Sequence, residues 1–239
     1  MTDLTDRIAL VTGASRGIGR AAAMGLAQAG AHVVALARGK SVGALEALDD
    51  AIRQETGRDV TLVPLNLTDA KGIDNLGAAL FDRFGRLDIL VANAGILGPL
   101  SPVGHIEPKD WDKTVAINLT ANFRLIRSLD PLLQRAEAGR AIFVTSGAVQ
   151  KCRAFWSAYS ATKAGLEALV KSYAHEVENS PVRANLLDPG PTRTAMRAQA
   201  FPGEEPETLP APEALVPLFV KLADPNLTAN GEVFRFSRG

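Results

Sequence analysis

The sequence predicts an α/β fold in which helices flank a doubly wound parallel sheet of about seven strands. Along the 239 residues, short apolar segments rich in Val, Ile and Leu alternate with longer segments of helical periodicity. Continuous apolar runs of this kind are typical of strands that are covered on both faces. Strands and helices that alternate at this spacing form right-handed crossovers and a parallel sheet. The length suits one domain that spans residues 1–239.

Six short apolar segments rich in Val, Ile or Leu are predicted to be buried strands, and a seventh strand closes the chain. In chain order, these predicted strands are Ile8–Thr12, His32–Ala37, Val60–Asn66, Leu87–Asn93, Ala141–Ser146, Val182–Asp188 and Glu232–Ser237.

Longer segments with helical periodicity lie between and after these strands. The predicted helices are Ile18–Ala29, Val42–Thr56, Ala70–Phe84, Trp111–Ala136, Ala158–Glu178 and Glu213–Ala223. Pro131 should kink or weaken the fourth of these helices, because proline lacks the backbone N–H that an internal helical turn requires.

One segment, Phe201–Pro212, interrupts the alternation before the last helix. Its prolines and glutamates exclude a regular element. We consider two interpretations, a surface linker and a mobile lid over a binding site. The residues that set this composition are Pro202, Glu204, Glu205, Pro206, Glu207, Pro210 and Pro212.

The bulk composition narrows the class of protein. Lys and Arg together number 26, as do Asp and Glu, so the formal net charge is zero and neither nucleic acid nor an anionic membrane is expected as a partner. Cys152 is the one cysteine, which excludes an intrachain disulfide and fits a reducing compartment. The apolar run that follows the polar N-terminus is too short for a signal peptide or a membrane span, so we expect a cytoplasmic protein. The three histidines lack metal-ligand spacing, and no metal is expected.

A glycine-rich turn, Thr12–Gly19, joins the first predicted strand to the first helix and reads Thr-Gly-Ala-Ser-Arg-Gly-Ile-Gly. Glycines there permit a tight turn and a close approach of the backbone to a pyrophosphate. The helix N-terminus adds free N–H groups and a partial positive charge. Three glycines alone also fit a flexible turn, but their place between strand and helix favours dinucleotide binding.

A second pattern places Tyr159 and Lys163 four positions apart at the start of a predicted helix, so that both side chains lie on one helix face. A nearby ammonium group lowers the pKa of a phenol and makes it a better base. Ser146 ends the fifth predicted strand, at the edge where ligands bind in doubly wound sheets. Taken alone, the Tyr–Lys spacing also fits an ordinary amphipathic helix.

Together these motifs closely resemble the short-chain dehydrogenase/reductase family of Rossmann-like oxidoreductases, over residues 7–195. The resemblance implies a catalytic tetrad in the order Asn118, Ser146, Tyr159 and Lys163. In it Tyr159 is the acid/base, Ser146 holds the substrate oxygen, and Asn118 distorts its helix and holds a water that relays protons to Lys163. The nucleotide part of the domain would then be about residues 1–100, and the catalytic part 101–239.

The resemblance also implies contacts with a nicotinamide dinucleotide. In the family, the pattern seen here as Asn93-Ala94-Gly95 lets the backbone lie close to the adenosine ribose and braces the sheet, so Asn93 fits a structural role as well as a ligand contact. A Pro-Gly turn with a following Thr holds the nicotinamide in the family. Asn66 departs from the family pattern, which has an Asp there. The predicted cofactor-binding residues are Gly13, Ser15, Arg16, Gly17, Ile18, Gly19, Arg38, Asn66, Leu67, Asn93, Ala94, Gly95, Tyr159, Lys163, Pro189, Gly190, Thr192 and Thr194.

The second predicted strand indicates which cofactor is used. Ala37 stands where NAD-binding proteins carry an acid for the ribose 2′-OH, and Arg38 follows it. With Arg16 in the glycine turn, two guanidinium groups suit a 2′-phosphate. The sequence therefore favours NADP(H) over NAD(H), although Arg38 also fits a solvated loop residue.

Three residues are candidates for substrate contact. Arg153, Phe155 and Trp156 lie between Ser146 and Tyr159, where they could contact an anionic or apolar substrate or could equally form a rim or a subunit contact. The resemblance implies a small carbonyl or alcohol substrate and a homodimer or homotetramer. Two alternatives remain, an NAD(H)-linked alcohol dehydrogenase and a non-catalytic dinucleotide-binding protein.

Overall fold

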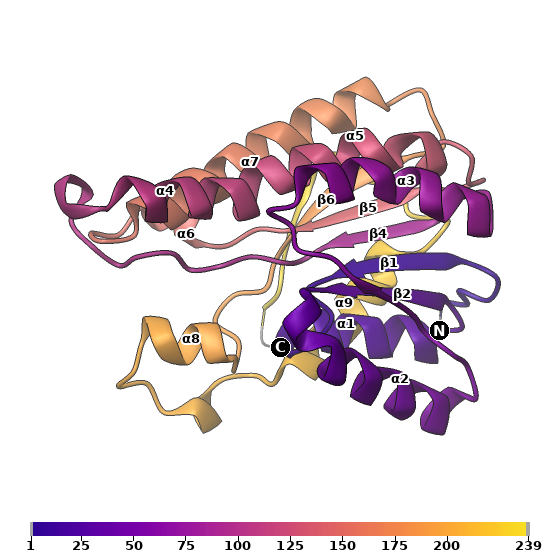
Figure 1. The fold of residues 1–239 in the computed structure, drawn as a ribbon, viewed down its shortest axis with the longest axis horizontal. Coiled ribbons are helices and arrows are strands. Elements are labelled where there is room, and N and C mark those ends of the chain that lie inside the picture. The colour runs from indigo at the N-terminus through magenta and orange to yellow at the C-terminus, as the bar shows by residue number, and fades with distance from the viewer. Residues whose placement is uncertain (1, 238–239) are drawn as a thin grey trace.

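The structure, a computed structural model, describes residues 2–237. Seven parallel strands form one sheet in the order β3-β2-β1-β4-β5-β6-β7. In Figure 1, α3, α5 and α7 lie on one side of the sheet, and α1, α2 and α9 lie on the other. The predicted doubly wound fold is therefore confirmed, while Met1, Arg238 and Gly239 of the predicted domain lie outside the described residues.

The strands occur where the sequence predicts them. Two of them coincide with their predicted bounds, and the others differ at their ends, where the chain leaves the ladder for the connecting loops. The observed strands are β1 (Ile8–Thr12), β2 (His32–Ala37), β3 (Thr61–Pro64), β4 (Ile89–Ala92), β5 (Arg140–Val144), β6 (Arg183–Asp188) and β7 (Val233–Arg235).

The helices follow the predicted periodicity less closely. The second and third match their predicted bounds, whereas two short helices, α6 and α8, were not predicted. The observed helices are α1 (Gly17–Gln28), α2 (Val42–Thr56), α3 (Ala70–Phe84), α4 (Pro108–Val115), α5 (Ala121–Leu133), α6 (Ala148–Lys151), α7 (Ser157–Glu176), α8 (Ala195–Ala200) and α9 (Val216–Leu222).

The prediction of one helix over Trp111–Ala136 was wrong. The helix starts at Pro108, a residue whose fixed φ suits the first helical turn. A π-helical turn at Ala116–Thr120 then separates α4 from α5. Pro131 lies in the last turn of α5, which ends two residues later at Leu133. The interruption therefore lies around Asn118 and not at the proline, because the side chain of Asn118 is bound to a neighbouring loop.

Residues 201–211 are irregular, as predicted, except for a short 3₁₀ turn at Pro206–Thr208, and Pro212 begins a second 3₁₀ turn, Pro212–Leu215, that leads into α9. Ion pairs tie this segment to the chain before it. Glu204 binds the Arg197 guanidinium through two contacts of 2.5 and 2.6 Å, and Glu207 pairs with Arg193. The segment and α8 form a lobe beside the carboxyl ends of the strands (Figure 1).

Alternate residues of the strands build two apolar cores. Leu10 of β1 points toward the layer of α3, α5 and α7, whereas Ala9 and Val11 point toward the layer of α1, α2 and α9. Phe143 and Phe219 are among the largest fully buried side chains of the two cores. Each such burial contributes about 1.5–3 kcal/mol to the packing of the two helical layers on the sheet.

Residues 2–237 contain neither a membrane-spanning helix nor a cluster of metal ligands. None of the described helices has the length and apolar character needed to cross a membrane. Within residues 2–237, no group of three or more His, Cys, Asp or Glu side chains is arranged to hold a metal ion.

Candidate functional site

A cavity of about 860 Å³ lies at the carboxyl edge of the sheet. The loops after β1, β2, β4, β5 and β6 all reach it, because parallel strands end at the same edge. The glycine turn and Arg38 line one part of the cavity, and Ser146, Tyr159 and Lys163 line another. Every predicted cofactor-binding residue except Gly19 lines it.

The glycine turn has the geometry of a phosphate cradle. Gly13 and Gly17 have φ values of 70° and 55°, which residues with a side chain adopt only with strain. A Cβ at Gly19 would lie 2.3 Å from the carbonyl oxygen of Gly13, so this helix position accepts no side chain. Helix α1 begins at Gly17, and its first N–H groups are free to bind an anion. These residues therefore fit a dinucleotide pyrophosphate.

Hydrogen bonds between Asn93 and Thr12 hold the start of the glycine turn to the loop after β4. Asn93 Nδ2 donates to the carbonyl oxygen of Thr12 at 2.9 Å, and the Thr12 hydroxyl accepts from the backbone N–H groups of Asn93 and Ala94, each at 3.0 Å. A Cβ at Gly13 would lie 2.9 Å from Asn93 Nδ2. These contacts assign Asn93 a structural part in holding the loops after β1 and β4 together.

Two exposed guanidinium groups, Arg16 after β1 and Arg38 after β2, line the cavity. Neither forms an ion pair in the described part of the chain. Ser41, in the same turn as Arg38, also lines the cavity and was not predicted from the sequence. Its signal was a hydroxyl three residues after Arg38 in the loop that follows β2. This group of donors suits an anion larger than a hydroxyl group.

Tyr159 and Lys163 come together on the buried face of the first turns of α7. Their side chains are 8% and 4% exposed, and Lys163 Nζ lies 5.9 Å from the centre of the Tyr159 ring. Lys163 Nζ donates to the carbonyl oxygen of Val144 at 2.8 Å. Ser146 hydrogen-bonds to the Tyr159 side chain from the end of β5. The three polar groups thus converge on one end of the cavity.

Burial dominates the protonation of both groups. It raises the pKa of the Tyr159 phenol, the hydrogen bond with Ser146 opposes that rise, and the charge of Asp188 adds to it. Burial also lowers the pKa of the Lys163 ammonium to about 8. Without a bound ligand, Tyr159 is therefore a proton donor throughout the neutral range, and Lys163 titrates at its alkaline end.

Asn118 is fully buried and does not line the cavity. Its Oδ1 accepts from the backbone N–H of Ile96 and its Nδ2 donates to the carbonyl oxygen of Ile96, both at 2.9 Å. Nδ2 also donates to Thr162 at 3.2 Å. The helix is distorted at this residue, as the resemblance implies, and a Cβ at Gly95 would lie 3.3 Å from Asn118 Oδ1 and 3.6 Å from Lys163 Nζ.

The Pro-Gly turn after β6 closes the cavity against the glycine turn. Gly190 has a φ of 61°, and the Thr192 hydroxyl donates to the carbonyl oxygen of Pro189 at 3.1 Å. Thr194 caps α8 by accepting from the backbone N–H of Arg197, and its methyl group would lie 3.5 Å from a Cβ at Gly17. The two turns therefore meet across the cavity.

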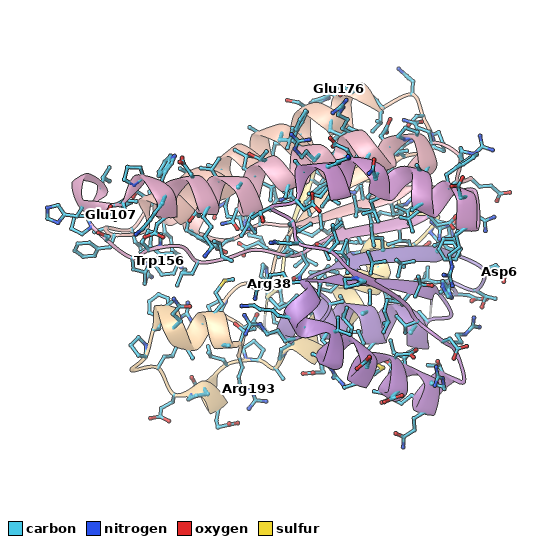
Figure 2. All side chains as sticks on the ribbon, viewed as in Figure 1. Asp6, Arg38, Glu107, Trp156, Glu176 and Arg193 are labelled. Atoms are coloured by element: carbon cyan, nitrogen blue, oxygen red, sulfur yellow. The ribbon has the colours of Figure 1, made fainter. Side chains whose placement is uncertain are left out.

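The three predicted substrate residues separate in the structure. Arg153 and Trp156 line the cavity, whereas Phe155 does not and is 56% exposed. The Trp156 ring contacts Tyr159 edge-on, with centroids 5.9 Å apart, and lies 5.5 Å from the ring of Phe201. Figure 2 shows Trp156 between the upper helical layer and the lobe of α8. Phe201 was missed as a cavity residue because the sequence does not reveal how its irregular segment folds back.

Comparison of the sequence with protein families finds a match to the model described as short chain dehydrogenase, over residues 7–205. Among curated proteins, the uncharacterized oxidoreductase YciK of Escherichia coli (strain K12) is 39% identical over 221 residues. The match covers 92% of this chain and 86% of YciK.

Solved structures match over nearly the whole chain. A short chain dehydrogenase of Shigella flexneri 2a str. 301, complexed with NADP, is 38% identical with a TM-score of 0.93, and the match covers 98% of this chain and 99% of that one. A short chain dehydrogenase of Escherichia coli CFT073, complexed with NADPH, is 37% identical with a TM-score of 0.92 and covers 97% of both chains.

Proposed function

The chain belongs to the short chain dehydrogenase family and is an NAD(P)-dependent oxidoreductase, and from this premise we propose that it reduces small carbonyl compounds with NADPH through Tyr159. One observation carries the proposal. Tyr159, Lys163 and Ser146 converge on the same cavity whose other end is a glycine turn shaped for a pyrophosphate. A proton donor, an ammonium group and a hydroxyl then surround one place for a reacting oxygen.

The side chains divide the work of carbonyl reduction. The bound nicotinamide supplies the hydride. The Ser146 hydroxyl donates a hydrogen bond to the carbonyl oxygen and stabilises the negative charge that develops there. Tyr159 donates its phenolic proton to the same oxygen, and the Lys163 ammonium stabilises the phenolate that remains. In the oxidative direction these proton transfers run in reverse.

We propose that Asn118 supports this proton transfer by holding a water molecule next to Lys163. The Asn118 side chain is hydrogen-bonded to the backbone of Ile96. The backbone carbonyl oxygen of Asn118 accepts from the side chain of Asn122 at 2.8 Å. A carbonyl oxygen has a second lone pair, which is available to a water molecule. The gap left by Gly95 beside Lys163 Nζ is consistent with a water there.

The test is to incubate the protein and NADPH with a panel of aldehydes and ketones of increasing size. The loss of NADPH absorbance measures turnover. Trp156 and Phe201 favour substrates with a compact apolar or aromatic group, and Arg153 favours those that also carry a carboxylate. No turnover of any carbonyl compound, with nucleotide binding intact, would identify a non-catalytic dinucleotide-binding protein instead.

The same assay has an expected pH dependence. Reduction requires a protonated Tyr159, and its raised pKa keeps the phenol protonated at neutral and mildly alkaline pH. Lys163 loses its charge above its pKa of about 8. The value of kcat/KM for the carbonyl substrate should therefore be constant near neutral pH and fall above about pH 8. A profile that rises through this range would contradict the assigned roles.

We also propose that NADP(H) is preferred over NAD(H), because Arg16, Arg38 and Ser41 line one part of the cavity. Replacing Arg38 by Ala should weaken NADP⁺ binding about 10- to 100-fold and change NAD⁺ binding little, since only NADP⁺ carries the 2′-phosphate. Titration calorimetry with both nucleotides measures the two dissociation constants.

Lys40→Ala is the matched control for Arg38→Ala. Lys40 is an exposed cation two residues away that does not line the cavity, so its loss should leave both affinities nearly unchanged. Equal weakening of NADP⁺ and NAD⁺ binding by Arg38→Ala, or an equal effect of Lys40→Ala, would contradict the assigned 2′-phosphate site.

A homodimeric or homotetrameric assembly and a cytoplasmic location stay predictions from the sequence.

A further inference from the structure

Asp188 is a buried acid in the cavity that the proposed proton transfers do not use. It is the last residue of β6 and only 7% exposed, yet it lines the cavity together with Ser146 and Tyr159. Its backbone is fixed on one side by the ladder to β7, and its carbonyl oxygen accepts from the N–H of Phe236 at 2.9 Å. The position of its side chain is therefore set by the sheet.

The two carboxylate oxygens have different surroundings. Oδ1 accepts from the backbone N–H of Gly190 at 3.1 Å and closes a tight turn over Pro189. Oδ2 lies 3.4 Å from where a Cβ of Gly147 would be, next to Ser146. The second oxygen therefore lies between the loops that follow β5 and β6, both of which line the cavity.

Within residues 2–237, no cationic side chain lies at ion-pair distance from this acid. Among the ion pairs formed within residues 2–237, none includes Asp188. Lys163, the buried amine of the site, donates to the carbonyl oxygen of Val144. A buried carboxylate with one backbone donor and no counter-charge is costly, and a cationic ligand beside it would lower that cost.

The acid also acts on the reacting end of the cavity. Its charge contributes to the raised pKa of Tyr159, which means that the two groups interact electrostatically. The nicotinamide ring is neutral when reduced and carries a positive charge when oxidised. In the proposed function, this ring is the one group at that end of the cavity that becomes positive during turnover.

We propose that Asp188 is the residue that sets the balance between the two redox forms of the bound cofactor, by favouring the positively charged oxidised ring. The inference rests on the proposed function, which brings the ring to Tyr159. Asp188 then tightens NADP⁺ relative to NADPH, and it does so without taking part in the proton transfer.

Binding of the two nucleotides tests this directly. In Asp188→Asn, which keeps the shape and the acceptor for Gly190, the ratio of the dissociation constants of NADP⁺ and NADPH should rise roughly five- to tenfold. Titration calorimetry gives both constants without turnover. Asp188→Glu, which keeps the charge, should leave the ratio close to that of the wild type.

The matched control is Glu178→Gln, which removes the same charge from an exposed residue. Glu178 lies two residues beyond α7, whose last residue, Glu176, is about 25 Å along the helix axis from Tyr159. Its replacement should leave the ratio unchanged. Should Asp188→Asn fail to fold, Asp188→Ser, whose hydroxyl can accept from Gly190, replaces it in the same titration.

The outcomes separate the two proposals. If the wild-type protein binds neither nucleotide, the proposed function fails. If both nucleotides bind and the ratio in Asp188→Asn equals that of the wild type, the role of Asp188 is wrong and the proposed function stands. An unchanged ratio accompanied by selective loss of substrates that carry a hydroxyl or ammonium group would overturn the inference in favour of substrate recognition by Asp188.

Discussion

Replacing Tyr159 by Phe is expected to lower kcat for carbonyl reduction by about a hundredfold to ten-thousandfold. Phe fills nearly the same volume against Trp156 but has no proton to donate and no hydroxyl for Ser146 to hold. The fold and nucleotide binding should persist, because the loss is confined to one polar atom. Steady-state kinetics with NADPH and titration of the nucleotide measure the two properties separately.

The chain contains a matched control in its other tyrosine, Tyr173, which is equally buried in the same helix. Its hydroxyl donates to Asp130 at 2.7 Å, and Tyr173 does not line the cavity. Tyr173→Phe should cost about 1 kcal/mol of unfolding free energy and leave kcat nearly unchanged. Comparable activity in both variants would exclude Tyr159 as the proton donor.

The second large effect is expected from Gly19→Ala, which should abolish measurable nucleotide binding and destabilise the fold by about 1–3 kcal/mol. The added Cβ would lie 2.3 Å from the carbonyl oxygen of Gly13 and 2.5 Å from Asn93 Nδ2. A backbone atom cannot rotate away as a flexible side chain would, so the glycine turn must open. Nucleotide titration and thermal unfolding record the two consequences.

Gly43→Ala provides the comparison, because a Cβ at Gly43 in α2 meets nothing within 4 Å. A helical glycine with free space around it should gain about 0.4–1 kcal/mol of stability when replaced by Ala, with nucleotide binding unchanged. Wild-type affinity in Gly19→Ala would contradict the close packing of the glycine turn on α1.

The fold was largely readable from the sequence because its signals are local. The strand at residues 8–12 and the helices at residues 42–56 and 70–84 were predicted with their observed bounds. Burial on both sides of the sheet gives strands a continuous apolar run, and burial on one side gives helices their periodicity. The periodicity of residues 111–136 did not reveal the helix break around Asn118, which only the family resemblance implied, because a contact with Ile96, 22 residues earlier in the chain, is associated with it.

The functional site likewise combines features that follow from short sequence patterns with features that depend on the folded chain. The glycine turn and the spacing of Tyr159 and Lys163 are short patterns whose geometry follows from one turn or one helix face, and the structure brings both to one cavity. The direction of a loop side chain is not encoded in this way. Phe155 and Trp156 are adjacent in the sequence, yet only Trp156 lines the cavity, because the backbone of Phe155 adopts a φ of 72°.

By itself, the sequence determined the order of strands and helices, the glycine turn between β1 and α1, and the Tyr–Lys pair. Only the tertiary structure decided that Phe201 returns to contact Trp156, that Ser41 lines the cavity with Arg38, and that Asp188 is buried with no ion pair to any other described residue. The physical reason is how far apart in the sequence the interacting residues lie. Periodicity and turns depend on neighbours along the chain, whereas burial, charge compensation and the lining of a cavity depend on segments that meet only when the sheet is complete.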